Sequence, residues 1–226
     1  METNMIRTHL VAALVGGLLS APSAKAAENT SGIGADRISI FKVPLVCPAA
    51  PQIGCGSASK PILLDLEQQP GVLEAWLNRA GTRIAVVWKP QSNSDLRSKV
   101  VAELKEDHAT ELEGKSRDQD LKSFQSGKGW YHGADVDRLS EEEADVIAAR
   151  LVRWVQAKTA LPKEKAELLQ RALDDTLRKD LTGGKHRRIE EVARDYLNED
   201  ELKVLRQAVK DELEIENGER PVPKEG

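Results

Sequence analysis

The chain has 226 residues, of which 40% are hydrophobic, 31% charged and only 4% aromatic, and its formal net charge is −4 at pH 7. This composition is typical of a soluble, helix-rich protein and excludes a multi-spanning membrane protein. The slightly acidic balance provides no overall field that would attract nucleic acid. Only two cysteines and four histidines are present, which excludes a disulfide-dense scaffold and four-cysteine zinc or iron–sulfur sites.

Residues 1–26 have the features of an export signal. A charged start at Arg7 precedes an apolar run over 10–21, and small residues stand at Ala24 and Ala26. The run is too short to cross a hydrocarbon core roughly 30 Å thick, and this pattern is typical of a cleaved secretory signal. The sequence therefore predicts a periplasmic or secreted protein with no transmembrane segment after cleavage. Two nearby cysteines can pair in such an oxidising compartment.

The first half of the chain predicts alternating strands and helices after a flexible lead-in over 27–37. The predicted elements are a strand starting at 38 and ending near Val43, a helix starting near Pro61 and ending before Pro70, strands over 72–78 and 83–88, a helix over 95–106 and a short strand within 108–112. In the strand over 83–88, apolar residues occupy both alternating faces, so both faces of the sheet are expected to be covered.

This order, strand–helix–strand–strand–helix–strand, predicts an α+β fold of ferredoxin-like βαββα(β) type for residues 38–112. Residues 113–138 are charged and glycine-containing and predict a linker, with Trp130 and Tyr131 as a packing anchor. Residues 139–214 predict a small all-α domain of four helices, the first opened by a capping box of Ser140 and Glu143 and the fourth capped by Asn198 with Glu201. Residues 215–226 predict a disordered tail.

The chemistry of the chain is expected at Cys47 and Cys55, which seven residues separate in a loop rich in proline and glycine. Two thiolates brought together between a strand and a helix can bind a soft cation, and copper(I) and mercury(II) accept two sulfur ligands. A nearby helix N-terminus would favour the thiolate. A structural disulfide that closes the loop is an equal alternative, and thiol–disulfide exchange is a further one, although the spacing is not that of a C-x-x-C redox motif.

Residues 38–112 resemble a heavy-metal-associated domain, the module of copper chaperones, metal-pumping ATPases and the periplasmic mercury-binding protein. The resemblance is carried by Pro70-Gly71-Val72, by Asn78 and by the segment Val86-Val87-Trp88-Lys89-Pro90. It implies metal-binding cysteines after the first strand, where Cys47 and Cys55 lie. The family's usual site has two residues between its cysteines and a Gly-Met before the first, whereas seven residues and Leu45-Val46 stand here.

The sequence as a whole therefore predicts an exported soft-metal binding or delivery protein that is not an enzyme. Copper(I) or mercury(II) would be held by Cys47 and Cys55, and the partner would be a metal-transport or metal-resistance protein rather than nucleic acid. The alternatives are a non-catalytic interaction module with a Cys47–Cys55 disulfide and a thiol–disulfide exchange protein. His108, His132 and His186 lie in polar segments, where a solvated side chain is the more usual state. No nucleotide-binding or hydrolase motif is present.

Overall fold

The computed structural model describes residues 32–106, 108–184 and 187–216. Within these residues the protein is a mixed α/β structure with seven α-helices and a five-stranded antiparallel sheet. The predicted signal over 1–26, its cleavage site, most of the lead-in and residues 217–226 lie outside the described residues. No helix in the described part of the chain is long and apolar enough to cross a membrane.

The sheet has the strand order β4-β1-β3-β2-β5, and every neighbouring pair is antiparallel. Its strands are β1 (Ile38–Lys42), β2 (Val72–Asn78), β3 (Arg83–Trp88), β4 (Thr110–Glu111) and β5 (Trp130–His132). Helix α1 (Gly56–Gln68) connects β1 to β2, and helix α2 (Ser94–Glu106) connects β3 to β4. Residues 38–112 thus contain both helices and strands, with β1, α1, β2, β3, α2 and β4 following one another along the chain.

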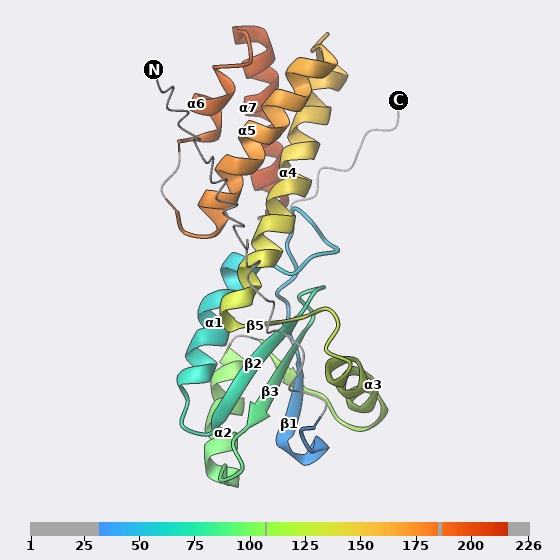
Figure 1. The fold of residues 1–226 in the computed structure, drawn as a ribbon, viewed down its shortest axis with the longest axis vertical. Helices are drawn as coiled ribbons and strands as arrows, with labels where there is room; N and C mark the ends of the chain where they lie inside the picture. Colours follow the sequence, from blue (N-terminus) through green and yellow to red (C-terminus); the bar gives the residue numbers. More distant parts are fainter. Residues whose placement is uncertain (1–31, 107, 185–186, 217–226) are drawn as a thin grey trace, which may run out of the picture.

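Both faces of the sheet are buried, as the alternation in β3 predicts. Ile84, Val86 and Trp88 belong to the core shared with α1 and α2, whereas Ala85 and Val87 belong to a second apolar cluster. Helix α3 (Gly114–Gln125) covers this second face with apolar side chains and lies opposite α1 and α2 in Figure 1. Side chains of a strand point alternately to opposite faces, so this single strand contributes to two cores.

Residues 113–138, predicted to be a linker, are folded. They contain α3, β5 and a short 3-10 helix over Gly133–Val136, and β5 pairs with β2 to extend the sheet. Leu121, Phe124 and Trp130 are at most 7% exposed and pack against β-strand residues of the second face. The local sequence is polar because the rest of α3 faces solvent, and its few apolar residues are enough to cover this face.

Four further helices form the second half of the described chain: α4 (Asp137–Lys158), α5 (Lys163–Leu181), α6 (Ile189–Ala193) and α7 (Glu199–Glu216). Helix α4 packs against α1, α5 and α7. Figure 1 shows α4 running from the sheet region into the helical layer. One continuous cluster of buried apolar residues extends from Phe41 in β1 to Ala208 in α7.

Two helix starts differ from the sequence-based expectation. Helix α1 begins at Gly56 rather than near Pro61, which lies inside it, because the Cys55 N–H is held by the Leu45 carbonyl and Cys55 becomes the N-cap. Helix α4 begins at Asp137, so Ser140 and Glu143 do not form the predicted capping box. Helix α7 continues to Glu216, two residues into the predicted tail.

The start of α7 is a capping box, as its sequence predicts. The Asn198 side chain accepts hydrogen bonds from the N–H groups of Asp200 and Glu201, and the Glu201 carboxylate accepts one from the Asn198 N–H.

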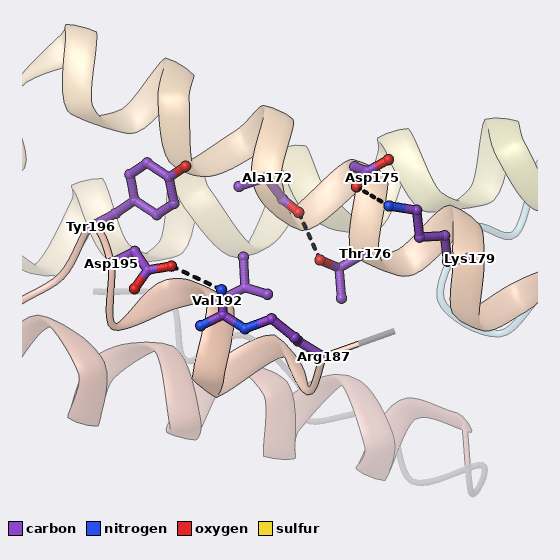
Figure 2. Close-up of a pocket in the computed structure, with 8 residues that line it drawn as sticks. All are labelled: Ala172, Asp175, Thr176, Lys179, Arg187, Val192, Asp195 and Tyr196. Atoms are coloured by element: carbon purple, nitrogen blue, oxygen red, sulfur yellow. Dashed lines mark hydrogen bonds and ion pairs between the residues drawn. The ribbon is translucent and has the colours of Figure 1, made fainter. Parts of the chain in front are cut away.

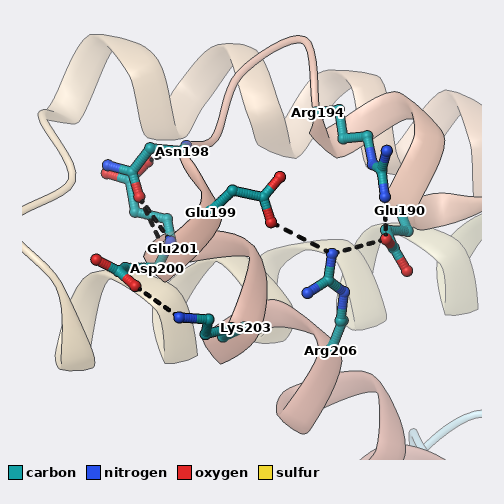
Figure 3. A network of polar contacts seen from close by, with 8 residues as sticks. All are labelled: Glu190, Arg194, Asn198, Glu199, Asp200, Glu201, Lys203 and Arg206. Atoms are coloured by element: carbon teal, nitrogen blue, oxygen red, sulfur yellow. Dashed lines mark hydrogen bonds and ion pairs between the residues drawn. The ribbon is translucent and has the colours of Figure 1, made fainter.

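The same region carries an ion network, shown in Figure 3, in which Glu190 of α6 contacts Arg194 and Arg206, each at 2.8 Å. Because Arg206 belongs to α7, this network joins the two helices.

Helix α1 can approach α4 closely only because residue 56 is glycine. A Cβ atom there would lie 2.4 Å from Ser140 Oγ and 2.7 Å from the Val136 carbonyl oxygen. We predict that Gly56→Ala lowers the free energy of unfolding by roughly 1–3 kcal/mol, because backbone atoms of α4 must move. Denaturant melts test this, with Gly32→Ala as the matched control because nothing lies within 4 Å of its Cβ position. Equal stability of the two variants would contradict the packing described.

Hydrogen bonds from Arg206 and Arg194 lower the pKa of Glu190 from 4.5 to about 2. A carboxylate whose pKa is lower in the folded state stabilises the fold above its unfolded pKa, and this stabilisation is lost as the pH falls toward the folded pKa. We therefore predict that the wild type melts at a higher temperature than Glu190→Gln at neutral pH. The two melting temperatures should converge as the pH falls from 4.5 to about 2. Glu167→Gln, which removes an exposed carboxylate 3.9 Å from Lys163, is the control for the loss of one surface charge.

Candidate functional site

The two cysteines lie at the ends of a short hairpin, which we call the cysteine loop and define as residues 45–55. Val46 and Gly54 form an isolated antiparallel bridge, the Cys47 N–H donates to the Ile53 carbonyl at 2.9 Å, and the Cys55 N–H donates to the Leu45 carbonyl at 2.8 Å. Residues on alternate positions of paired strands share a face, and diagonal neighbours on that face lie roughly 7–8 Å apart. This register places the side chains of Cys47 and Cys55 on the same face of the hairpin.

The cysteine loop is fixed against the β2–β3 turn. The Leu45 N–H donates to the Gly81 carbonyl at 2.9 Å, and the Gly54 N–H donates to the Arg79 carbonyl at 2.7 Å. Gly81 has φ +68°, and a Cβ atom there would collide with the Leu45 carbonyl. A glycine is therefore required at this contact for both conformational and steric reasons. These hydrogen bonds hold the two ends of the cysteine loop, at Leu45 and Gly54, against the β2–β3 turn.

Cys47 is a buried free thiol. Its side chain is 1% exposed, its Sγ donates a hydrogen bond to Glu143 Oε1 at 3.0 Å, and the same sulfur accepts one from the Ala50 N–H at 3.1 Å. Burial raises the pKa of the Cys47 thiol far above its usual range, and the hydrogen bond to Glu143 and the negative charge of that carboxylate raise it further. A small additional contribution comes from Cys55. Cys47 is therefore held in the protonated form.

Cys55 is a free thiol in a different environment. It is the N-cap of α1, its side chain is half-buried, and its Sγ lies 3.4 Å from Ser57 Oγ. The first backbone N–H groups of an α-helix have no partner within the helix, and the helix dipole places partial positive charge there. Of the two sulfurs, Cys55 is thus the one that a reagent can reach from solvent.

Glu143 is the acidic residue of the site, although its spacing from Ser140 predicts a capping-box role instead. It lies in α4, is 3% exposed, and reaches back across 96 positions of the chain to Cys47. The sequence does contain a pattern that predicts the burial of Glu143. Glu143 lies four residues from Leu139 and four from Ile147, both buried, which places it in the apolar stripe of the helix rather than on its solvent face.

The histidines described by the structure lie elsewhere. His108 is exposed in the turn between α2 and β4, where its φ is +61°. His132 is in β5, with its Nε2 3.0 Å from Glu67 Oε1 and its ring against Trp76. His186 lies outside the described residues. Among the residues with described positions, no three or more His, Cys, Asp and Glu side chains gather as a metal site. The soft-metal assignment of Cys47 and Cys55 stays a prediction.

A cavity of about 580 Å³ lies between α5 and α6, and neither Cys47 nor Cys55 is among the residues that line it (Figure 2). Its charged side chains are already paired with one another, Lys179 with Asp175 at 2.5 Å and Arg187 with Asp195 at 3.0 Å. It therefore offers a polar surface whose charges are balanced within the protein. The two thiols of the cysteine loop lie beside the buried carboxylate of Glu143, and we take these three groups as the candidate functional site.

Comparisons of the chain with family models, with curated proteins and with solved structures find no match.

The different environments of the two thiols predict selective alkylation. We expect iodoacetamide to modify Cys55 in the folded protein much faster than Cys47, because Cys47 is buried and held in the protonated form, and only thiolates react. Both residues lie in one tryptic peptide, so the single variants Cys47→Ser and Cys55→Ser assign the reaction by mass spectrometry. In denaturant the two variants should react at similar rates. Equal rates in the folded protein would contradict the burial of Cys47.

Proposed function

We propose that Cys47 and Cys55 form a redox pair that alternates between a dithiol and a disulfide by exchange with a second thiol or disulfide compound. The observation that carries this proposal is the asymmetry of the pair. Cys55 is half-buried at the N-terminus of a helix, whereas Cys47 is buried on the same face of a hairpin and hydrogen-bonded to a carboxylate. An accessible attacking thiol beside a sheltered second thiol is the arrangement that two-step exchange requires.

The exchange has two steps. In the first, the Cys55 thiolate attacks a disulfide of the client, which forms a mixed disulfide and releases one client sulfur as a thiolate that takes up a proton. In the second, Cys47 loses its proton and attacks Cys55 Sγ. The Cys47–Cys55 bond forms, the mixed disulfide breaks, and the second client sulfur leaves as a thiolate that is then protonated. The client disulfide is reduced to two thiols and the cysteine pair is oxidised.

The soft-metal function predicted from the sequence would use the same two sulfurs, and we place it second. Capture of copper(I) or mercury(II) would have to displace the proton of Cys47, whose pKa is raised by burial and by Glu143. The assignment of Cys47 and Cys55 as metal ligands stays a prediction. A purely structural disulfide in an interaction module is the remaining alternative, and the reduction potential distinguishes it.

We further propose that residues 38–112 are a ferredoxin-like unit and that α4–α7 are a second, helical unit docked on it. The element order β1-α1-β2-β3-α2-β4 and the antiparallel pairing of β4, β1, β3 and β2 support the first part. In the heavy-metal-associated domains that residues 38–112 resemble, the cysteines follow the first strand, as Cys47 and Cys55 do. Export through the predicted signal would place the pair in an oxidising compartment, where a reversible disulfide is chemically useful.

The redox proposal is tested by equilibrating the full chain with glutathione buffers and measuring the fraction of Cys47–Cys55 disulfide by mass spectrometry. We expect an intramolecular disulfide with a reduction potential above about −300 mV, since labile and catalytic bonds lie above this value and inert structural bonds below it. The reduced wild type should also reduce a model disulfide, and the Cys47→Ser and Cys55→Ser variants should not complete the reaction.

Two results would overturn the redox proposal. A potential far below −300 mV would identify a structural bond. Failure to form the disulfide, together with one tightly held copper(I) or mercury(II) ion per reduced chain in equilibrium dialysis, would favour the metal-carrier function. In the latter case the Cys47→Ser/Cys55→Ser double variant should lose the ion.

A further inference from the structure

A hydrogen bond between two buried side chains connects the cysteine loop to the helical half of the protein. The Cys47 thiol donates to Glu143 Oε1 at 3.0 Å, and both side chains are nearly inaccessible, at 1% and 3% exposure. The proton of this buried thiol must leave before the sulfur can attack, because the thiolate is the nucleophile. Solvent water has little access to the sulfur, so the proton acceptor has to come from the protein.

We infer that Glu143 is the catalytic base that takes the proton from Cys47 when Cys47 attacks the mixed disulfide on Cys55. This inference rests on the proposed redox function and deepens it. In the step, the Cys47 proton moves to Glu143 Oε1 and the sulfur electron pair forms the bond to Cys55 Sγ. The bond between Cys55 and the client sulfur breaks, and its electron pair leaves on the client sulfur. Glu143 then returns its proton to solvent or to the departing thiolate.

Contact with the thiol singles out Glu143 among the carboxylates of the elements packed around Cys47, because its Oε1 lies 3.0 Å from Cys47 Sγ. Asp137 and Glu142 of the same helix instead contact Lys60 of α1 at 2.6 Å and Arg79 of the β2–β3 turn at 2.7 Å.

Two further groups near Cys47 are unsuited to accept its proton. Arg150 of α4 donates to the Ala49 carbonyl, and as a guanidinium it accepts no proton. Cys55, the other titratable group that acts on Cys47, is the atom under attack.

The packing of α4 on α1 fixes this base in position. The Ser140 side chain, one turn before Glu143, is fully buried and its Oγ would lie only 2.4 Å from a Cβ atom at Gly56. The N-terminus of α1, where Cys55 lies, and the turn of α4 that carries Glu143 are thus in direct contact. A base within hydrogen-bonding distance of the proton that it removes satisfies the geometric requirement for general base catalysis.

Proton transfer inside the Cys47–Glu143 pair has a distinctive pH dependence. While Glu143 is ionised and Cys47 protonated, the transfer exchanges no proton with solvent, so the rate of the attack should not change with pH. In Glu143→Gln the proton must be lost to solvent before attack, and the rate should rise about tenfold for each pH unit below the pKa of Cys47. The amide keeps the size of the side chain and can still accept the thiol hydrogen bond.

The experiment uses the full-length reduced protein and an aromatic disulfide whose released thiolate is coloured. Attack by Cys55 releases one aryl thiolate, and attack by Cys47 on the resulting mixed disulfide releases a second. Stopped-flow absorbance from mildly acidic to neutral pH gives the rate of each phase, and Cys47→Ser isolates the first. We expect a second phase that is flat with pH in the wild type and rises about tenfold per unit in Glu143→Gln.

Two variants serve as controls. Glu142→Gln changes the neighbouring residue of α4, whose carboxylate is partly exposed and paired with Arg79, and it should keep the flat profile. Glu143→Asp retains the acid and should keep a flat profile at a lower rate. Circular dichroism checks that each variant is folded. If Glu143→Gln is not folded, the wild-type profile and Glu143→Asp still decide, because a tenfold rise per unit in both would overturn the inference.

The outcomes separate the two proposals. A wild type that never releases the second aryl thiolate contradicts the redox pair itself. A second release with the same pH slope in the wild type and Glu143→Gln leaves the redox pair intact and removes Glu143 as its base. A faster second phase in Glu143→Gln at all pH values would mean that Glu143 only disfavours ionisation of the Cys47 thiol. This result would also overturn the inference.

Discussion

The candidate site depends on one buried contact, the hydrogen bond from the Cys47 thiol to Glu143. It brings together a loop that follows the first strand and a helix that begins ninety-odd positions later. A carboxylate in an apolar interior is unfavourable unless polar groups surround it, and a thiol beside that carboxylate keeps its proton. The contact therefore ties the chemistry of the cysteine loop to the docking of α4. Any movement of α4 away from α1 would alter this hydrogen bond and with it the protonation of the Cys47 thiol.

The surrounding structure keeps this contact in place through close backbone packing. Gly56 allows α1 to approach α4, and Gly81 allows the cysteine loop to approach the β2–β3 turn. In both places a side chain would force backbone atoms apart. The absence of a side chain at Gly56 and Gly81 therefore allows the close packing that sets the positions of the two sulfurs. The sheet supplies a rigid base because both of its faces are covered, one by α1 and α2 and the other by α3.

Local patterns in the sequence predict much of this fold and only part of the site. The alternation of Ile84, Val86 and Trp88 predicts a buried strand, and Asn198 with Glu201 predicts the start of α7, because these signals depend on neighbours in the chain. The start of α1 depends on a hydrogen bond to Leu45 across the cysteine loop. Helix α3 has few apolar residues, and only the second face of the sheet gives them a place to pack. The spacing of Glu143 from buried apolar residues of α4 predicts a buried position. No local pattern identifies its partner, because Cys47 lies 96 positions away in the sequence.

A double-mutant cycle between positions 47 and 143 tests the central contact most directly. The free energy of unfolding is measured for the wild type, Cys47→Ala, Glu143→Met and the double variant, all under reducing conditions. Residues that share a buried hydrogen bond show coupling energies of about 0.5–3 kcal/mol, and a coupling of that size is the predicted result. Additive effects, with a coupling near zero, would contradict the contact and the chemistry built on it.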